Sequence, residues 1–167
     1  NLLKELQYKK QNRSQLAVWN AYLVEYGSQV IFKRIQFLKL LVPMARRVQQ
    51  QLTQQSERFT VTYHCSMGAI GDFSLEQIKA LYERIVEQKL AEEILRGTTL
   101  CGPHRDDLIF YLNGMDLKRY GSQGQQRTGI LSLKIAELQT FYQCYGEYPI
   151  LLLDDVMSEL DDNRRHD

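Results

Sequence analysis

Residues 120–127 read Tyr-Gly-Ser-Gln-Gly-Gln-Gln-Arg, and residues 150–155 read Ile-Leu-Leu-Leu-Asp-Asp. These two stretches decide how the rest of the chain is interpreted, because each joins a structural signal to chemically capable side chains. Small residues at a helix start let a ligand approach the backbone, and the free N–H groups there favour an anion such as phosphate. An apolar strand that ends in two carboxylates places acids at the edge of an α/β sheet where ligands bind.

Both stretches also have a purely structural interpretation. Ser122 at the start of a helix is an ordinary N-cap residue, and taken alone the stretch favours that interpretation. Asp154 and Asp155 would equally suit a strand that runs into a solvated loop. If they do mark a site, adjacent acids project differently, so one would hold a metal-bound water while the other orients an attacking water.

Hydrophobic spacing predicts a mixture of helices and strands. From Leu16 to Leu52 the apolar residues follow a helical repeat, and Pro43 is expected to kink or break that helix near Val42. Asn113-Gly114 is a strong hairpin signal. The other predicted elements are a strand at 59–63, a helix from a Ser74–Gln77 capping box to Gly97, a strand at 108–112, a return strand at 115–118, a helix at 125–143 containing Gly129, and a buried parallel strand at 150–153.

The charge is unevenly divided along the chain. Lys and Arg number 21 and Asp and Glu 20 in the 167 residues, a net charge of +1. Residues 1–60 hold ten basic and three acidic residues, whereas residues 61–167 hold eleven and seventeen. A basic segment before an acidic one predicts two surfaces with different partners. The composition, 44% hydrophobic and 25% charged, argues against collagen-like, disulfide-rich and mostly disordered chains.

The cysteines and the apolar runs indicate the cellular compartment, and the ends of the chain indicate whether it is a fragment. Cys65, Cys101 and Cys144 form no C-x-x-C pair, so we expect reduced, mostly buried thiols in a cytoplasmic protein. No uncharged apolar run approaches the roughly 18 residues of a membrane helix, and no membrane partner is expected. Both ends look cut, which suggests a fragment of a longer protein.

Taken in order, the motifs resemble the second half of an ABC-type ATPase head. Residues 122–125 resemble the signature loop, residues 150–154 a Walker B strand and residues 158–161 a D-loop. The sequence resembles still more closely the RecF family of bacterial DNA-repair ATPases, which are related to SMC heads. The matching residues are Gly102-Pro-His-Arg-Asp-Asp-Leu108, Asn113-Gly114, residues 120–127 and the run from Pro149 to Asp161.

The resemblance implies an α/β fold that forms part of an ABC-type, P-loop NTPase head with an inserted, mainly helical arm. Residues 1–100 would be the arm, and residues 101–167 the C-terminal part of the head. No G-x-x-x-x-G-K-[ST] occurs in the 167 residues, so the phosphate-cradling P-loop is missing from this chain. We therefore expect the chain alone to be inactive and the intact parent to be a weak ATPase.

In this family two heads close around ATP, and each supplies its signature loop to the nucleotide held by the other. The resemblance therefore implies that ATP is bound in trans by Ser122, Gln123, Gly124 and Gln125. Arg127 and Arg105 are further candidates for a phosphate or interface contact, although Arg127 would also suit a plain helix surface. The His104-Arg105-Asp106 run has no firm role, and a structural brace is the favoured interpretation.

The remaining implied site residues follow the predicted strand at 150–153. Asp154 would support Mg²⁺ through water, and Asp155 would be the catalytic acid at a position where most ABC enzymes carry Glu. The shorter acid suits slow hydrolysis, with ATP acting mainly as a dimerisation switch. Ser158 and Asp161 would lie at the dimer interface.

The implied function is that of a recombination mediator in DNA replication and repair. ATP and Mg²⁺ would be its cofactors, and ATP would control homodimerisation on DNA at single-strand gaps and single-/double-strand junctions. RecR and RecO-type mediators would be partners, with the recombinase RecA reached indirectly. The basic segment would attract the phosphate backbone, although from charge alone a solvated helix face is the simpler interpretation. The alternative is a nonenzymatic, partner-binding arm of an SMC-like protein.

Overall fold

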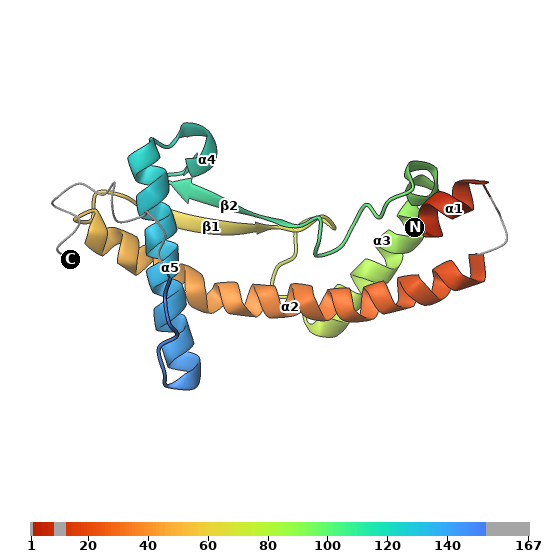
Figure 1. Ribbon diagram of the computed structural model, residues 1–167, viewed down its shortest axis with the longest axis horizontal. Helices are drawn as coiled ribbons and strands as arrows, with labels where there is room; N and C mark the ends of the chain where they lie inside the picture. The colour runs from red at the N-terminus through yellow and green to blue at the C-terminus, as the bar shows by residue number, and fades with distance from the viewer. Residues whose placement is uncertain (1, 9–12, 153–167) are drawn as a thin grey trace. The chain divides into compact units, whose positions relative to one another are not determined.

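The computed structural model describes residues 2–8 and 13–152 of the chain (Figure 1). These residues contain both helices and short strands, so the mixed helix and strand pattern predicted from the sequence is confirmed. The elements are α1 (Leu2–Tyr8), α2 (Arg13–Leu52), β1 (Phe59–His64), α3 (Leu75–Arg96), β2 (Asp107–Leu112), β3 (Met115–Asp116), α4 (Leu117–Tyr120) and α5 (Gln123–Tyr145).

Of the kink or break predicted at Pro43, the break is wrong, because helix α2 runs unbroken through this residue. Proline removes one backbone hydrogen bond, but packing on both sides of it keeps the helix in one piece. Leu41 and Ala45 are both buried in the same apolar cluster, whereas Pro43 itself is exposed. Within the described part of the chain, no helix combines the length and apolar character needed to cross a membrane.

The sheet has the order β1-β2-β3, and β2 pairs with β3 antiparallel through Leu112 and Met115 (Figure 1). Asn113 and Gly114 both have positive φ, at 52° and 83°, which confirms the predicted hairpin turn. Strand β3 is shorter than predicted because Asp116 caps α4. Its carboxylate accepts the N–H groups of Lys118 at 2.9 Å and Arg119 at 3.2 Å, which turns the chain into a helix.

By contacts the chain divides into two compact units, each made of two stretches. The first comprises Asn1–Gln36 and Tyr63–Asp107, and the second Phe37–Thr62 and Leu108–Asp167. Helix α2 contributes to both units. These two units are defined by compactness alone. The expected division into an arm and a head segment at residue 100 is a functional one, and it stays a prediction.

Each unit has its own apolar core. The first packs α2 against α3 around fully buried Ile31, Ile78 and Tyr82. The second packs α2, the sheet and α5 around Phe59 and Ala136. The second core includes residues from the middle of α5, the helix that opens with the predicted signature loop.

Helix ends and close contacts follow the sequence signals. The Ser74–Gln77 capping box opens α3, and Gly97 ends it in the left-handed conformation with φ 65°, both as predicted. Gly129 in α5 lies against α4 and β1, since a Cβ there would come within 2.7 Å of Leu117 Cδ2 and 3.3 Å of Phe59 Cε2. Close packing therefore explains this helical glycine.

The predicted buried strand at 150–153 is wrong for the residues that the structure describes. Residues 150–152 form no strand, and Ile150 and Leu152 are 92% and 89% exposed. A strand of this kind needs parallel neighbours and a layer of helices on each face. The sheet of the described residues provides only β1, β2 and β3, with no parallel neighbour for residues 150–152.

Candidate nucleotide-binding site

The start of α5 is a reciprocal capping box between Ser122 and Gln125. The Oγ of Ser122 accepts the backbone N–H of Gln125 at 3.2 Å, and Oε1 of Gln125 accepts the backbone N–H of Ser122 at 3.0 Å. Helix α5 therefore begins at Gln123, two residues before the predicted start. The Ser-x-x-Gln spacing carried this information, because the same spacing correctly predicted the start of α3.

The turn nevertheless keeps groups that are able to bind an anion. Ser122, Gln123 and Gly124 are exposed, and the backbone N–H groups of Gln123 and Gly124 precede the first intrahelical bonds. A Cβ at Gly124 would meet only Ser122 Oγ, at 4.0 Å, so space is open above the backbone. The Ser122 hydroxyl hydrogen is also available, because the capping bond uses only its oxygen. The four predicted signature residues thus lie together in a shape and charge that suit a phosphate.

The short connection between α4 and α5 is held by one side chain. Nε2 of Gln126 donates to the carbonyl oxygens of Leu117 at 3.2 Å, Lys118 at 3.3 Å and Gly121 at 3.1 Å. Gly121 has no room for a Cβ, which would lie 2.5 Å from Leu117 O. Sequence reasoning gave Gln126 no role, and no local pattern marks a side chain that caps the preceding helix.

Arg127 lies in the first turns of α5, and Arg105 lies in the other compact unit. Arg127 is half-buried and already has an interaction partner in the chain. Arg105 donates from Nε to Thr99 O at 3.0 Å and from Nη2 to Thr98 Oγ1 at 2.9 Å. The guanidinium of Arg105 therefore ties its own loop, while a phosphate contact by either arginine stays a prediction.

The neighbours of Arg105 hold the same loop. His104 Nε2 is 2.9 Å from Thr99 Oγ1. The Asp106 carboxylate accepts the N–H of Ser66 at 2.7 Å and the hydroxyl of Tyr63. Burial, followed by the contact with Asp106, raises the pKa of the Tyr63 phenol well above its usual range. These contacts favour the structural interpretation of the His104-Arg105-Asp106 run, as a brace inside the first unit.

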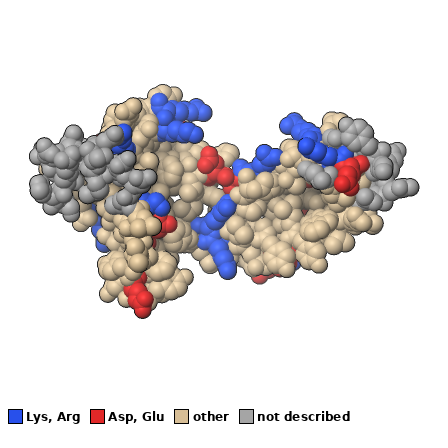
Figure 2. All heavy atoms as spheres, viewed as in Figure 1, with Lys and Arg blue, Asp and Glu red and all other residues tan. Residues whose placement is uncertain are grey.

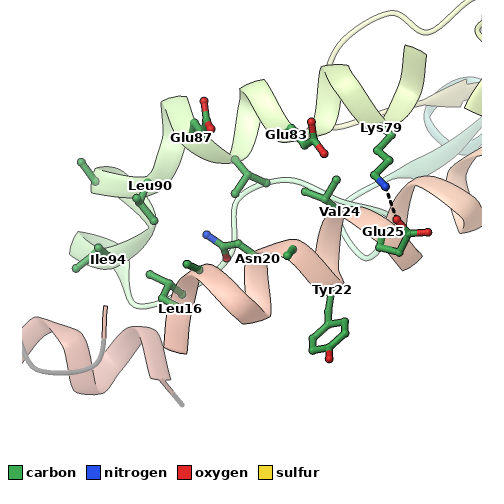
Figure 3. Close-up of a pocket in the computed structure, with 14 residues that line it drawn as sticks. Leu16, Asn20, Tyr22, Val24, Glu25, Lys79, Glu83, Glu87, Leu90 and Ile94 are labelled. Carbon is green, nitrogen blue, oxygen red and sulfur yellow. Dashed lines mark hydrogen bonds and ion pairs between the residues drawn. The ribbon is translucent and has the colours of Figure 1, made fainter. Parts of the chain in front are cut away.

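A groove of about 710 Å³ lies between α2 and α3 in the first unit (Figure 3). Its lining is mainly apolar, with Leu16 and Val24 from α2 and Leu90 from α3. Lys79 pairs with Glu25, and this hydrogen bond lowers the pKa of Glu25. Glu83 and Glu87 leave the lining acidic, so the groove suits an apolar or cationic group rather than a phosphate.

Comparison with known proteins gives a consistent result. No family model matches the sequence. The chain is 48% identical to the DNA replication and repair protein RecF of Halothermothrix orenii and 45% identical to that of Bacillus subtilis, over 99% of this chain in each case. This chain is homologous to RecF. It spans about 45% of the length of these RecF proteins.

The fold agrees with the sequence comparison. A solved structure described as the recombination mediator protein RecF-ATP in the RecFOR pathway matches 98% of this chain with a TM-score of 0.87 and 34% identity. A second RecF structure, with ATPrS, matches equally well. In both cases the match covers 43% of the RecF chain. The match confirms the expected fold class, an α/β fold that is part of an ABC-type head with an inserted helical arm.

Four residues of the RecF-like motifs lie beyond the part of the chain that the structure describes. Asp154, Asp155, Ser158 and Asp161 all fall in residues 153–167. Within residues 2–8 and 13–152, no group of three or more His, Cys, Asp or Glu side chains is placed to hold a metal ion. The Mg²⁺, catalytic and interface roles of these four residues therefore stay predictions.

Proposed function

We propose that this chain is the arm and C-terminal head segment of a RecF-type recombination mediator that acts in DNA replication and repair. Homologues with that name match nearly all of the chain, and its fold matches that of RecF with ATP. The observation that carries the proposal is the exposed turn at residues 122–125. Gly124 there has no internal packing reason to be glycine, because a Cβ would point into open space.

In the proposed mechanism the turn binds the terminal phosphate of an ATP molecule held by a second copy of the protein. Bound ATP supplies the negative charge that joins the two copies. The Ser122 hydroxyl and the N–H groups of Gln123 and Gly124 would donate to phosphate oxygens, aided by the positive end of the α5 dipole. Gln125 supports the turn from the side by accepting the Ser122 N–H.

The acids after the apolar run 150–153 complete the proposed site. Asp154 would hold Mg²⁺ through a water molecule, and Asp155 would orient the attacking water. Ser158 and Asp161 would contact the second copy. Because Asp155 is shorter than the usual glutamate, hydrolysis by the intact protein would be slow, and ATP would act mainly as a switch for homodimerisation.

DNA at single-strand gaps is the proposed partner, together with RecR and RecO-type mediators and, indirectly, RecA in the cytoplasm. The matched RecF structures are assigned to the RecFOR pathway, which supports the choice of mediators. On the face shown in Figure 2, Lys and Arg side chains lie in several small groups. One shallow hollow of about 640 Å³ in the second unit suits a backbone phosphate, since its lining includes two arginines and no acid: Arg46, Arg58, Thr60, Tyr111, Asn113 and Gly114.

The test is ATP-dependent binding of the full-length protein to gapped DNA. Ser122→Arg fills the turn and Asp154→Ala removes the proposed support for Mg²⁺, so both variants are expected to lose the ATP response. Arg58→Glu should weaken DNA binding and reduce its salt dependence, while nucleotide binding is retained. An unchanged ATP response in both Ser122→Arg and Asp154→Ala would contradict the proposal.

A second candidate function, a partner-binding arm that needs no nucleotide, is favoured by one surface of the first unit. Trp19, Tyr22 and Tyr26 are exposed along α2, and successive ring centroids lie 6.2 and 6.1 Å apart. Exposed aromatic rings of this kind are typical of protein interfaces. Binding of purified RecR to this chain without nucleotide, lost in Trp19→Glu, would favour this function over the ATP switch.

A further inference from the structure

The carboxylate of Glu57 lies between two side-chain amides in the second unit. Its Oε1 accepts Nε2 of Gln125 at 3.0 Å, and its Oε2 accepts Nε2 of Gln49 at 2.8 Å. The Oε1 of Gln49 in turn accepts the Ser132 hydroxyl at 2.7 Å, and both of these residues are fully buried. A chain of hydrogen bonds therefore leads from the inner face of α5, through α2, back to the first turn of α5.

The chemistry of Glu57 fixes the orientation of Gln125. A carboxylate only accepts hydrogen bonds, so the Gln125 amide must present its NH₂ group to Glu57. Its carbonyl oxygen is then left facing the Ser122 N–H, which it accepts at 3.0 Å. A flipped amide would set NH₂ against the Ser122 N–H and oxygen against the Glu57 carboxylate, so the capping bond to Ser122 N–H and the bond to Glu57 would both be lost.

The backbone turns sharply between the end of α2 and Glu57. Gln54 and Gln55 both have positive φ, at 49° and 65°, a conformation that is unfavourable for residues with a Cβ. The turn is tied by the hydroxyls of Thr53, which donates to Gln49 O at 2.7 Å, and of Ser56, which donates to Thr53 O at 2.6 Å. These bonds end α2 and fix the path of the chain that leads to Glu57.

We infer that Glu57 is a positioning residue that acts through Gln125 to hold the Ser122 turn ready for a terminal phosphate. The inference rests on the proposed function and deepens it. A turn that is already closed loses little conformational freedom when an anion binds, and binding is stronger for that reason. The link also joins the phosphate-facing turn to α2, because Glu57 contacts Gln49 of that helix.

A reciprocal swap tests the link in the chain itself. In Gln125→Glu two carboxylates face each other, and amide hydrogen exchange at Ser122 is expected to speed up about tenfold as the capping bond opens. The double variant Glu57→Gln with Gln125→Glu restores one donor between them, and exchange should return to about the wild-type rate. Gln143→Glu, the same substitution at an exposed position of α5, is the matched control and should leave the exchange rate at Ser122 unchanged.

A second measurement separates positioning from simple stability. In the full-length protein, Glu57→Met should raise the ATP concentration needed for half-maximal self-association about tenfold. Glu137→Met is the control, because Glu137 is exposed on α5 and contacts only Lys134 among the described contacts. Were Glu57→Met not to fold, the swap would still test the link, since both swap variants keep a polar side chain at position 57.

Three results would overturn the inference: unchanged exchange at Ser122 in Gln125→Glu, no recovery in the swap, or a wild-type ATP response in Glu57→Met. Failure of the proposed function has a different signature. In that case the wild-type protein itself would show no ATP-dependent association, and Glu57 would have no role in nucleotide binding. Faster exchange, recovery in the swap and a weakened ATP response together support the inference.

Discussion

Ser122 and Gln125 exchange two hydrogen bonds, Oγ to N–H at 3.2 Å and Oε1 to N–H at 3.0 Å, across the first turn of α5. The same pair therefore serves as a helix cap and as the frame of the proposed phosphate site. The two interpretations that the sequence offered for this turn are compatible, because capping uses the oxygen of Ser122 and leaves its hydroxyl hydrogen and two N–H groups for a ligand.

The two glycines of α5 should respond differently to alanine. Gly124→Ala meets open space, so its free energy of unfolding should stay the same or rise by up to about 1 kcal/mol. Gly129→Ala would push a methyl group against Leu117 and Phe59 and should lower it by about 1–3 kcal/mol. Denaturant unfolding of the chain measures both values.

The same two glycine variants separate an effect on nucleotide-dependent association from an effect on stability. In the full-length protein, Gly124→Ala is expected to lose ATP-dependent association because the methyl group occupies the space proposed for phosphate. A stable Gly124→Ala variant with normal association would show that this space is not used. Equal stability losses in the two variants would contradict the packing described for Gly129.

The three thiols should differ in reactivity. Burial raises the pKa of the Cys65 and Cys101 thiols from 9.0 to about 11, whereas Cys144 is exposed. Because the thiolate is the reactive form, only Cys144 should react rapidly with a disulfide reagent in the native chain at pH 8. All three should react after unfolding in denaturant. Rapid reaction of two or three thiols without denaturant would contradict the buried placement.

The same two thiols predict a loss of stability in alkaline solution. Above pH 9 the unfolded chain begins to ionise Cys65 and Cys101, while the folded chain keeps them protonated until about pH 11. The folded state then binds more protons than the unfolded state, so the free energy of unfolding should fall across this interval. Unfolding midpoints of the wild type and of a Cys65→Ala, Cys101→Ala variant measure the effect, which should be smaller in the variant.

Asp106 should stabilise the first unit through two acceptor bonds. Asp106→Ala leaves the Tyr63 hydroxyl and the Ser66 N–H without this partner and is expected to lower the free energy of unfolding by about 1–3 kcal/mol. Asp106→Asn keeps one acceptor and offers a donor to the Tyr63 oxygen, so its free energy of unfolding should fall by less than that of Asp106→Ala. Equal losses in the two variants, measured by thermal unfolding, would contradict a role through these bonds.

Local signals in the sequence predicted the features that depend on neighbouring residues. The Ser74–Gln77 capping box, the Asn113-Gly114 turn and the left-handed end of α3 at Gly97 are each set within a few residues. The helix does not break at Pro43, and the sequence around this residue does not show that Leu41 and Ala45 pack into the core on either side of it. Residues 150–152 were misjudged because an apolar run becomes a buried strand only where parallel neighbours exist.

The candidate site likewise contains a turn that neighbouring residues predict and a long-range contact that they do not predict. The turn at 122–125 was identified from its own residues, since small side chains and a capping serine are local. The contact between Glu57 and Gln125 joins residues 68 positions apart. A single glutamate after α2 has nothing in its neighbourhood to mark it as a partner of the turn, so only the folded chain reveals this contact.

The central claim is that ATP joins two copies of the full-length protein through the Ser122 turn. Sedimentation velocity with and without ATP tests it most directly, using wild type, Ser122→Arg and Ser122→Thr. Threonine keeps both the hydroxyl and the N-cap and is the matched control. We predict an ATP-dependent dimer for wild type and Ser122→Thr, and a monomer at every ATP concentration for Ser122→Arg. A Ser122→Arg protein that dimerises with ATP as the wild type does would contradict the account.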